Sequence, residues 1–158
     1  MIRRLLPPSI DNRYGGHKLA LWLFGLLLFM RTAMGVNSIL NGRSVLTSAD
    51  GIPLDAYPSA AAQTLVSLFA LLGLSNLVLC LLGVLALARY RSMVPLMFAL
   101  FLTEHLGRRL ILYLLPVVRT GIPPGFYINL AILALMLVGL ALSLWRPRSR
   151  EEAPEATR

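Results

Sequence analysis

The sequence predicts an all-α integral membrane protein, built as an antiparallel bundle of four transmembrane helices with both termini in the cytoplasm. Hydrophobic residues make up 57% of the chain, above the share of about 45–50% that is typical of soluble domains. Several apolar runs are long enough to cross a hydrocarbon core about 30 Å thick, which takes roughly 20 helical residues. Positive charge gathers on one side of these runs, as membrane topology requires.

Four apolar segments meet the length requirement. They are rich in Leu, Ala and Val, are separated by turn or charged residues, and comprise residues 19–40, 60–88, 94–115 and 125–145. Their continuity argues against a transmembrane barrel, whose strands alternate in hydrophobicity over segments of about ten residues. Because lipid offers the backbone no hydrogen-bonding partners, helices are expected for all of these segments.

The distribution of arginine and lysine predicts the orientation. One side of the predicted bundle carries Arg3, Arg4, Arg13, Lys18, Arg89, Arg91, Arg146, Arg148, Arg150 and Arg158. The other side carries only Arg43 and Arg119. The positive-inside rule therefore places both termini in the cytoplasm, and a multi-pass protein of a bacterial inner (plasma) membrane is expected. The net charge of +8 follows this topology, so no nucleic-acid partner is expected.

The chain divides into three parts by composition. Residues 1–18 are expected to form a basic cytoplasmic N-terminal segment, residues 19–145 the membrane domain, and residues 146–158 a disordered cytoplasmic tail of charged and small residues. The basic start and the first apolar run also resemble a secretory signal. Hydrophobicity resumes after Arg31, which argues against cleavage of the first span without deciding it.

Two connections predict local structure. Residues 41–58 form the longest connection and are rich in turn formers, which predicts a defined extracytoplasmic loop. Residues 89–93 form the shortest, which predicts that the second and third spans lie side by side as an antiparallel hairpin.

The third apolar segment carries charged residues where a lipid-facing helix would have none. Charges inside a membrane usually face inward, pair with one another, and mark a functional site or a structural network. Residues four apart share a helix face, so Glu104 is expected beside Arg108, and His105 beside Arg109. A count of about 1.5 Å per residue places Arg31 of the first span level with Glu104, which predicts an ion pair between them.

The charges in this region are unbalanced, because three arginines accompany one glutamate. Arginine is suited to capture carboxylate or phosphate groups through two parallel hydrogen bonds. Two interpretations follow: an internal ion network completed by Asp50 and Asp55, or a site for an anionic small ligand or a membrane lipid. The candidates for the ligand site or ion network are Arg31, Glu104, His105, Arg108 and Arg109, and the candidates for lining a cavity are Asn37, Gln63, Asn76, Tyr113, Tyr127 and Asn129.

The sequence offers little support for catalysis, metals or cofactors. His17 and His105 lie far apart, and Cys80 is the only cysteine, so no metal-ligand spacing exists. The apolar segments contain no activated nucleophile and no second carboxylate beside Glu104. No catalytic residue and no cofactor is therefore expected, and no motif identifies a family.

Three function classes remain open at this stage. The favoured one is a non-enzymatic bundle that binds an anionic lipid or amphiphile, or that serves as an accessory subunit of a larger membrane complex. The alternatives are a small proton-coupled transporter that uses Glu104 and His105, and an intramembrane lipid-modifying enzyme. A homo-oligomer is compatible with each class.

Overall fold

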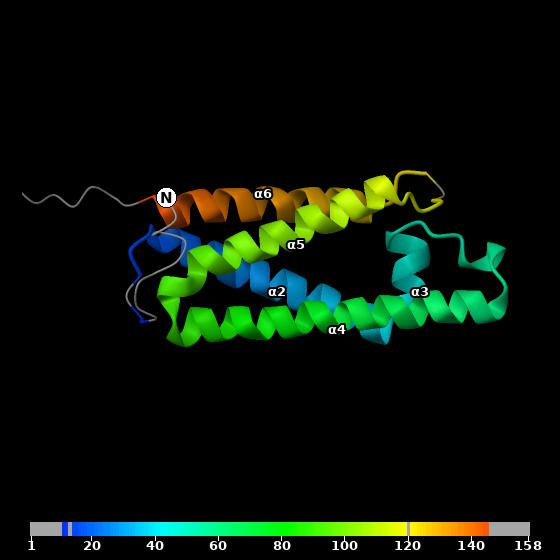
Figure 1. Cartoon of the computed structure of the whole chain (residues 1–158), viewed down its shortest axis with the longest axis horizontal. Coiled ribbons are helices and arrows are strands. Elements are labelled where there is room, and N and C mark those ends of the chain that lie inside the picture. Colours follow the sequence, from blue (N-terminus) through cyan, green and yellow to red (C-terminus); the bar gives the residue numbers. More distant parts are fainter. Residues whose placement is uncertain (1–10, 13, 120, 146–158) are drawn as a thin grey trace, which may run out of the picture.

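The described part of the protein is a bundle of long helices, and two of the connections between them contain short helical turns. The computed structural model describes residues 11, 12, 14–119 and 121–145. The long helices in this part of the chain are α2 (Lys18–Leu40), α4 (Ser59–Arg89), α5 (Val94–Leu114) and α6 (Gly125–Leu144), which run alongside one another (Figure 1). The expected disorder of residues 146–158 and the basic residues among 1–10 lie outside the described residues.

The helices begin and end within one residue of the apolar segments expected from the sequence. Proline marks the start of several of them. Pro58 and Pro124 directly precede α4 and α6, and Pro95 lies in the first turn of α5. Proline suits these positions because the first N–H groups of a helix have no partner within it.

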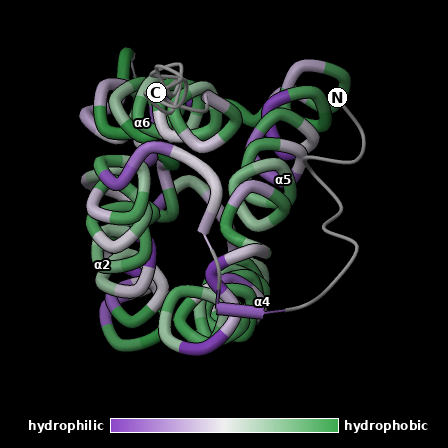
Figure 2. Tube along the Cα trace, turned by 90° about the vertical axis from the view of Figure 1, so that its left-hand side faces the viewer, coloured by the Kyte–Doolittle hydropathy of each residue, from purple (hydrophilic) through white to green (hydrophobic). Residues whose placement is uncertain are grey.

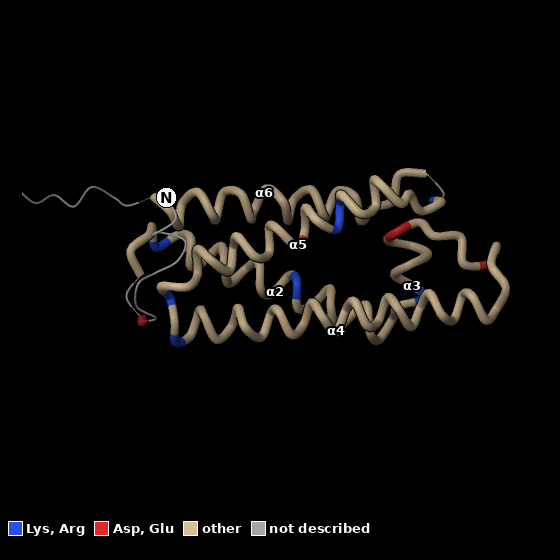
Figure 3. The backbone as a smooth tube through the Cα atoms, viewed as in Figure 1, with Lys and Arg blue, Asp and Glu red and all other residues tan. Residues whose placement is uncertain are grey.

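Three of these helices, α2, α4 and α6, are long and apolar enough to cross a membrane. This finding supports the prediction of a membrane-embedded protein. α5 has a similar length, at 21 residues, but it carries Glu104, Arg108 and Arg109. Figure 3 shows basic residues along α2 and α5, whereas most other charged residues of the described chain lie near the two ends of the bundle.

The bundle has two ends, which we name by what lies there. The termini end holds the start of α2 and the end of α6, and the loop end holds residues 41–58, 115–119 and 121–124. Viewed along the bundle, α2 lies between α4 and α6, while α5 lies across from α2 (Figure 2). The principal contacts join α2 to α4 and to α6, and α5 to α6.

The predicted hairpin of α4 and α5 is present at their turn, but the two helices diverge from there. The 3-10 turn η3 (Arg91–Met93) joins them, and α5 then crosses from α4 at the termini end to α6 at the loop end (Figure 1). Glycines explain this partnering. A Cβ atom on Gly73 of α4 would lie 3.0 Å from the Gly35 oxygen of α2, and one on Gly139 of α6 would overlap the Phe98 ring of α5.

The main hydrophobic core lies between all four long helices, α2, α4, α5 and α6. Phe24, Phe98 and Phe101 are fully buried there, and the rings of Phe24 and Phe98 meet edge to face with centroids 4.9 Å apart. Met136 of α6 completes the same cluster. Aromatic pairs of this kind add to the stabilisation that comes from burial alone.

The long loop contains more helix than the turn residues predicted. It holds α3 (Gly42–Ser44), the π-helical turn η1 (Val45–Ala49) and the 3-10 turn η2 (Leu54–Ala56). Leu46 and Leu54 are buried together with Ala62 of α4. Gly51 ends the helical stretch with a φ of 68°, a conformation that favours glycine. The apolar residues therefore fold this loop back onto α4.

The N-terminal segment closes the termini end of the bundle. The Asp11 N–H donates to Ser92 Oγ at 3.1 Å, and the Ser92 hydroxyl donates to the Asp11 carbonyl at 2.9 Å. The His17 N–H donates to the Leu142 carbonyl of α6 at 3.2 Å. Tyr14 packs against the main core, where its hydroxyl is buried without a hydrogen-bond partner. This segment therefore folds over the helix ends.

We expect Tyr14→Phe to leave stability at pH 8 unchanged or to raise it, because the variant removes a buried hydroxyl that has no partner. Burial raises the pKa of Tyr14 to about 12. The unfolded chain, with a tyrosine pKa of about 10, therefore ionises first, and the wild type loses stability as pH rises from the lower value to the higher one. The phenylalanine variant lacks this loss, so its advantage should grow at pH 11.

Thermal unfolding in detergent at pH 8 and pH 11 measures this difference. Tyr113→Phe serves as the control, because Tyr113 is exposed. A clear fall in the melting temperature of Tyr14→Phe at pH 8 would mean that the hydroxyl has a partner that stabilises the fold.

Candidate functional site

The predicted ion pair between the first and third apolar segments is present and is confirmed. Arg31 of α2 donates through Nη2 to Oε2 of Glu104 on α5. Arg31 also donates through Nε to Oδ1 of Asn76 on α4 at 2.9 Å, and Nδ2 of Asn76 donates to the Arg31 carbonyl at 2.8 Å. Only 8% of the Arg31 side chain is exposed. Three helices are therefore joined by one buried guanidinium group.

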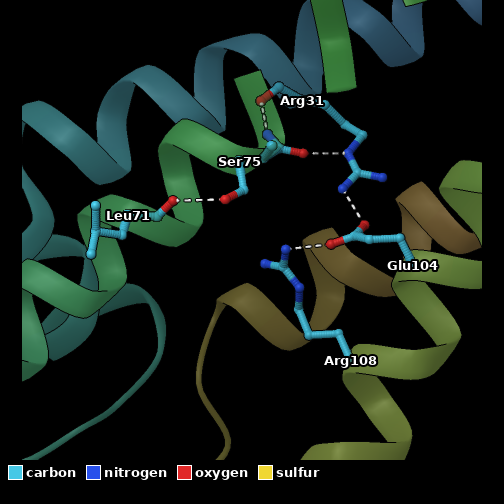
Figure 4. Close-up of polar contacts among 6 residues, drawn as sticks. Arg31, Leu71, Ser75, Glu104 and Arg108 are labelled. Carbon is cyan, nitrogen blue, oxygen red and sulfur yellow. Dashed lines mark hydrogen bonds and ion pairs between the residues drawn. The ribbon is translucent and has the colours of Figure 1, made fainter. Parts of the chain in front are cut away.

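Glu104 is shared between two arginines. Its second oxygen, Oε1, accepts a hydrogen bond from Arg108, one turn further along α5. Figure 4 shows the Arg31 and Arg108 side chains reaching the Glu104 carboxylate from different sides. Asp55 instead pairs with Arg43 at 3.5 Å, on an exposed part of the loop.

Aromatic rings support two of the guanidinium groups. The Arg31 guanidinium carbon lies 4.6 Å from the centroid of the Phe101 ring. The Arg109 guanidinium carbon lies 5.4 Å from the centroid of Phe126, at the start of α6. An aromatic face stabilises a cation electrostatically without neutralising it. These contacts hold the arginines in position and leave their charge available.

Some polar atoms in this group have no hydrogen-bond partner. Arg31 Nη1, His105 Nε2 and Arg109 Nη2 are buried without a hydrogen bond, and the residues Arg31 and His105 are more than nine-tenths buried. A buried polar group without a partner is costly, so native proteins rarely keep one without a reason. We call Arg31, Glu104, His105, Arg108 and Arg109 the arginine cluster. With neutral histidine, three positive charges against one negative charge give it a formal charge of +2.

Asp50 is the nearest further carboxylate at the loop end. A Cβ atom on Gly125 would lie 3.4 Å from Asp50 Oδ1, so this side chain sits at the start of α6. Burial raises the pKa of Asp50 above its ordinary value, and the positive charges of Arg119 and Arg108 oppose this rise. Arg119 and Asp50 carry opposite charges, so including both residues leaves the net charge of the region unchanged.

The six candidates for lining a cavity do not come together. Asn76 joins the arginine cluster through Arg31. Gln63, Tyr113 and Tyr127 are exposed, and Asn129 donates to the Gly125 carbonyl of its own helix at 2.8 Å. Asn37 lies in an open groove of about 380 Å³ along α2, which is lined by Phe29, Thr32, Ala33, Val36, Asn37, Leu40 and Asn41. That lining contains no member of the arginine cluster.

The sequence analysis did not predict the contacts of two contributors. Phe126 supports Arg109 across the α5–α6 contact, and its position at the start of a helix that follows two prolines gave no sign of this role. Asn76 was predicted to line a cavity, yet it makes two hydrogen bonds with Arg31. A count of residues along α4 could have predicted this contact by placing Asn76 at the same membrane depth as Arg31. A polar side chain in lipid forms hydrogen bonds with a partner at its own depth.

The described residues contain no group of three or more His, Cys, Asp or Glu side chains placed to hold a metal ion. The chemistry available in the arginine cluster is therefore hydrogen bonding and charge, supplied by guanidinium, imidazole and carboxylate groups. Comparison with known proteins adds no family: no family model, no curated protein and no solved structure matches the chain.

Proposed function

We propose that this protein crosses the membrane with four helices, α5 included, and that its arginine cluster binds an anionic lipid or amphiphile without chemical turnover. At about 1.5 Å per residue, α5 extends about 31 Å, which matches a hydrocarbon core about 30 Å thick. The arginine distribution favours cytoplasmic termini, and the proposal places the protein in a bacterial inner membrane.

One observation carries the proposal: the cluster keeps buried donors on Arg31 and Arg109, and a buried imidazole nitrogen on His105, without partners, while its formal charge is positive. A closed structural network would balance its charges and use its donors. An anion with several acceptor oxygens supplies both the missing charge and the missing acceptors. Phosphate and carboxylate groups have this chemistry, and guanidinium groups are suited to both.

The alternatives use the same residues in other ways. A proton-coupled transporter needs a carboxylate free to exchange its proton, whereas both oxygens of Glu104 accept hydrogen bonds from guanidinium groups. A role as an accessory subunit of a membrane complex is compatible with binding of a lipid, and we keep it within the proposal. Turnover of a lipid would need a nucleophile or activated water beside the cluster.

Native mass spectrometry of the detergent-purified full chain tests the proposal. Mass analysis first identifies any species retained through purification, and phosphatidic acid or inorganic phosphate is then added separately. We expect one retained anionic molecule per chain. Its occupancy should fall by about tenfold in Arg109→Gln, because one charge-assisted hydrogen bond is lost. Arg43→Gln is the matched control, because Arg43 lies on the exposed loop and pairs only weakly with Asp55.

The two additions separate the sources of the anion. Binding of phosphatidic acid alone indicates a lipid, whereas equal binding of inorganic phosphate indicates a soluble anion. Absence of any adduct, or equal adducts in Arg109→Gln and Arg43→Gln, would overturn the proposal and favour a purely structural ion network.

A further inference from the structure

The side chains along one face of α5 are buried at the start of the helix and partly exposed further along it. Val94, Met97 and Phe101 follow one another at spacings of three and four residues, and all three are buried. The next members of the same stripe are Glu104 and Arg108, whose side chains are 28% and 48% exposed. Residues spaced in this way share a helix face. The face of α5 that begins in the core therefore emerges from the bundle where the charged residues lie.

α4 shows the same change at a matching level. Ala86, Leu79 and Leu72 lie seven residues apart and share one face. Ala86 is buried and Leu79 packs partly against the main core, whereas Leu72 is 52% exposed. Leu65, seven residues further on, is again partly covered, by the loop cluster around Leu46 and Leu54. The exposed position lies one turn from Asn76, which is hydrogen-bonded to Arg31.

These two stripes lie where α4 and α5 diverge. α5 starts beside α4 at the termini end and finishes beside α6 (Figure 1). The other contacts around the cluster are tight. A Cβ on Gly73 would lie 3.0 Å from the backbone of α2, and one on Gly125 would lie 2.7 Å from the Ala49 carbonyl of the loop. The termini end is covered by the segment that hydrogen-bonds to Ser92 and Leu142. Among the neighbouring helix pairs, α4 and α5 make the fewest contacts, so the side between them is the least closed approach to Glu104 and Arg108.

The rim of this opening is apolar. Leu72 on α4 and Ile111 on α5 are both more than half exposed, and Leu68 continues the same surface on α4. Charged groups at the base and leucine side chains at the rim suit a molecule with an anionic headgroup and hydrocarbon chains. A small soluble anion would gain nothing from the apolar rim.

We propose that a membrane amphiphile reaches the arginine cluster sideways from the bilayer, between α4 and α5, with its anionic headgroup on Arg108 and its hydrocarbon chains along Leu72 and Ile111. This inference rests on the proposed function and adds to it the route of access and the residue that selects the headgroup. Arg108 is suited to selection because half of its side chain is exposed while Glu104 holds its guanidinium in place.

Quenching of tryptophan fluorescence by brominated lipids tests this route. Trp22 and Trp145 are both exposed and are replaced by phenylalanine, and one reporter is introduced at a time, Leu72→Trp or Leu74→Trp. These leucines are 52% and 51% exposed, but two positions on a helix turn the side chain by about 200°. Leu74 therefore lies at nearly the same depth on the opposite face of α4, and serves as the matched control.

The full chain is reconstituted in phosphatidylcholine vesicles with a small fraction of either brominated phosphatidic acid or brominated phosphatidylcholine. At position 72, we expect the quenching to report phosphatidic acid enriched by about tenfold over phosphatidylcholine. One charge-assisted hydrogen bond to the headgroup accounts for a preference of this size. The tryptophan at position 74 should sense both lipids equally. Arg108→Gln should abolish the preference, Arg108→Lys should retain part of it, and inorganic phosphate should leave it unchanged.

Results that differ from these expectations would contradict the binding place, the selecting residue or the need for hydrocarbon chains, as follows. Equal quenching at positions 72 and 74 by phosphatidic acid rules out the opening between α4 and α5 as its binding place. A preference that survives in Arg108→Gln rules out Arg108 as the selecting residue, and displacement by inorganic phosphate rules out a need for hydrocarbon chains. Retention of a lipid in native mass spectrometry alongside equal quenching would leave the proposed function standing and overturn only this route.

Discussion

Glu104→Gln should destabilise the protein by about 3 kcal/mol, because removing one partner of a buried ion pair leaves the other charge uncompensated. Arg31 would keep its hydrogen bonds with Asn76 but lose its only carboxylate among the described residues. Arg108 would also lose its partner, at a smaller cost, because nearly half of its side chain is exposed. Titration with SDS in mixed micelles, followed by helical circular dichroism, measures the change.

Asp55→Asn is the control for this measurement. It removes another arginine–carboxylate pair, Arg43 and Asp55, from an exposed position, where such pairs contribute less than about 1 kcal/mol. If Glu104→Gln shifts the unfolding midpoint no further than Asp55→Asn does, the buried pair does not stabilise the fold.

The double variant Arg31→Met with Glu104→Leu separates stability from binding. Replacing both members of a buried pair by apolar residues is often neutral for stability. We expect this variant to recover most of the stability lost in Glu104→Gln while failing to retain an anionic adduct. Recovered stability together with an unchanged adduct would show that the bound anion does not depend on Arg31 or on the Glu104 carboxylate.

Gly139→Ala should destabilise the protein by about 2 kcal/mol through overpacking. A Cβ at this position would overlap the Phe98 ring, which is fully buried against Phe24 and has little room to move. Relief would require α6 to move away from α5, and this would loosen the contact between Arg109 and Phe126 as well. Thermal unfolding in detergent at a fixed scan rate gives the expected drop in melting temperature.

Gly107→Ala is the same type of substitution, but it should raise the stability of the protein. Gly107 also lies within a long helix, but a Cβ there meets nothing within 4 Å. Alanine should therefore stabilise α5 by about 0.5–1 kcal/mol through its better helix propensity. Equal effects of the two substitutions would show that packing on Phe98 does not limit the approach of α5 and α6.

Helix positions were predictable because hydropathy reports them directly. Each long helix ends within one residue of its apolar segment, where proline, charged or turn-forming residues interrupt the run. The sequence was a weaker guide to which helices pack against one another. A short turn predicts that α4 and α5 are neighbours, but glycine contacts between α4 and α2, and between α6 and α5, decide the packing over most of their length. Such contacts depend on which faces meet, and hydropathy along one helix does not report this.

The site was predictable where charge and depth determine it. Counting residues placed Arg31 level with Glu104, because a buried cation and a buried anion at one depth have few alternatives to pairing. The proposed cavity residues followed weaker reasoning. Polar side chains near a membrane surface can be satisfied locally, as Asn129 is by the Gly125 carbonyl, so a common depth does not bring them together. The helical turns of the long loop were missed for a similar reason, because turn residues are also compatible with short helices.

The contacts of Arg31 have a consequence for the order in which the protein is made. Asn76 follows Arg31 by 45 residues and Glu104 follows it by 73. When α2 first leaves the ribosome, neither partner has been synthesised, so the helix carries a bare guanidinium group. α4 brings an amide, and only α5 brings the neutralising carboxylate. Integration of α2 into the bilayer is therefore completed by α5, and a nascent chain that ends between α4 and α5 retains an uncompensated charge within α2.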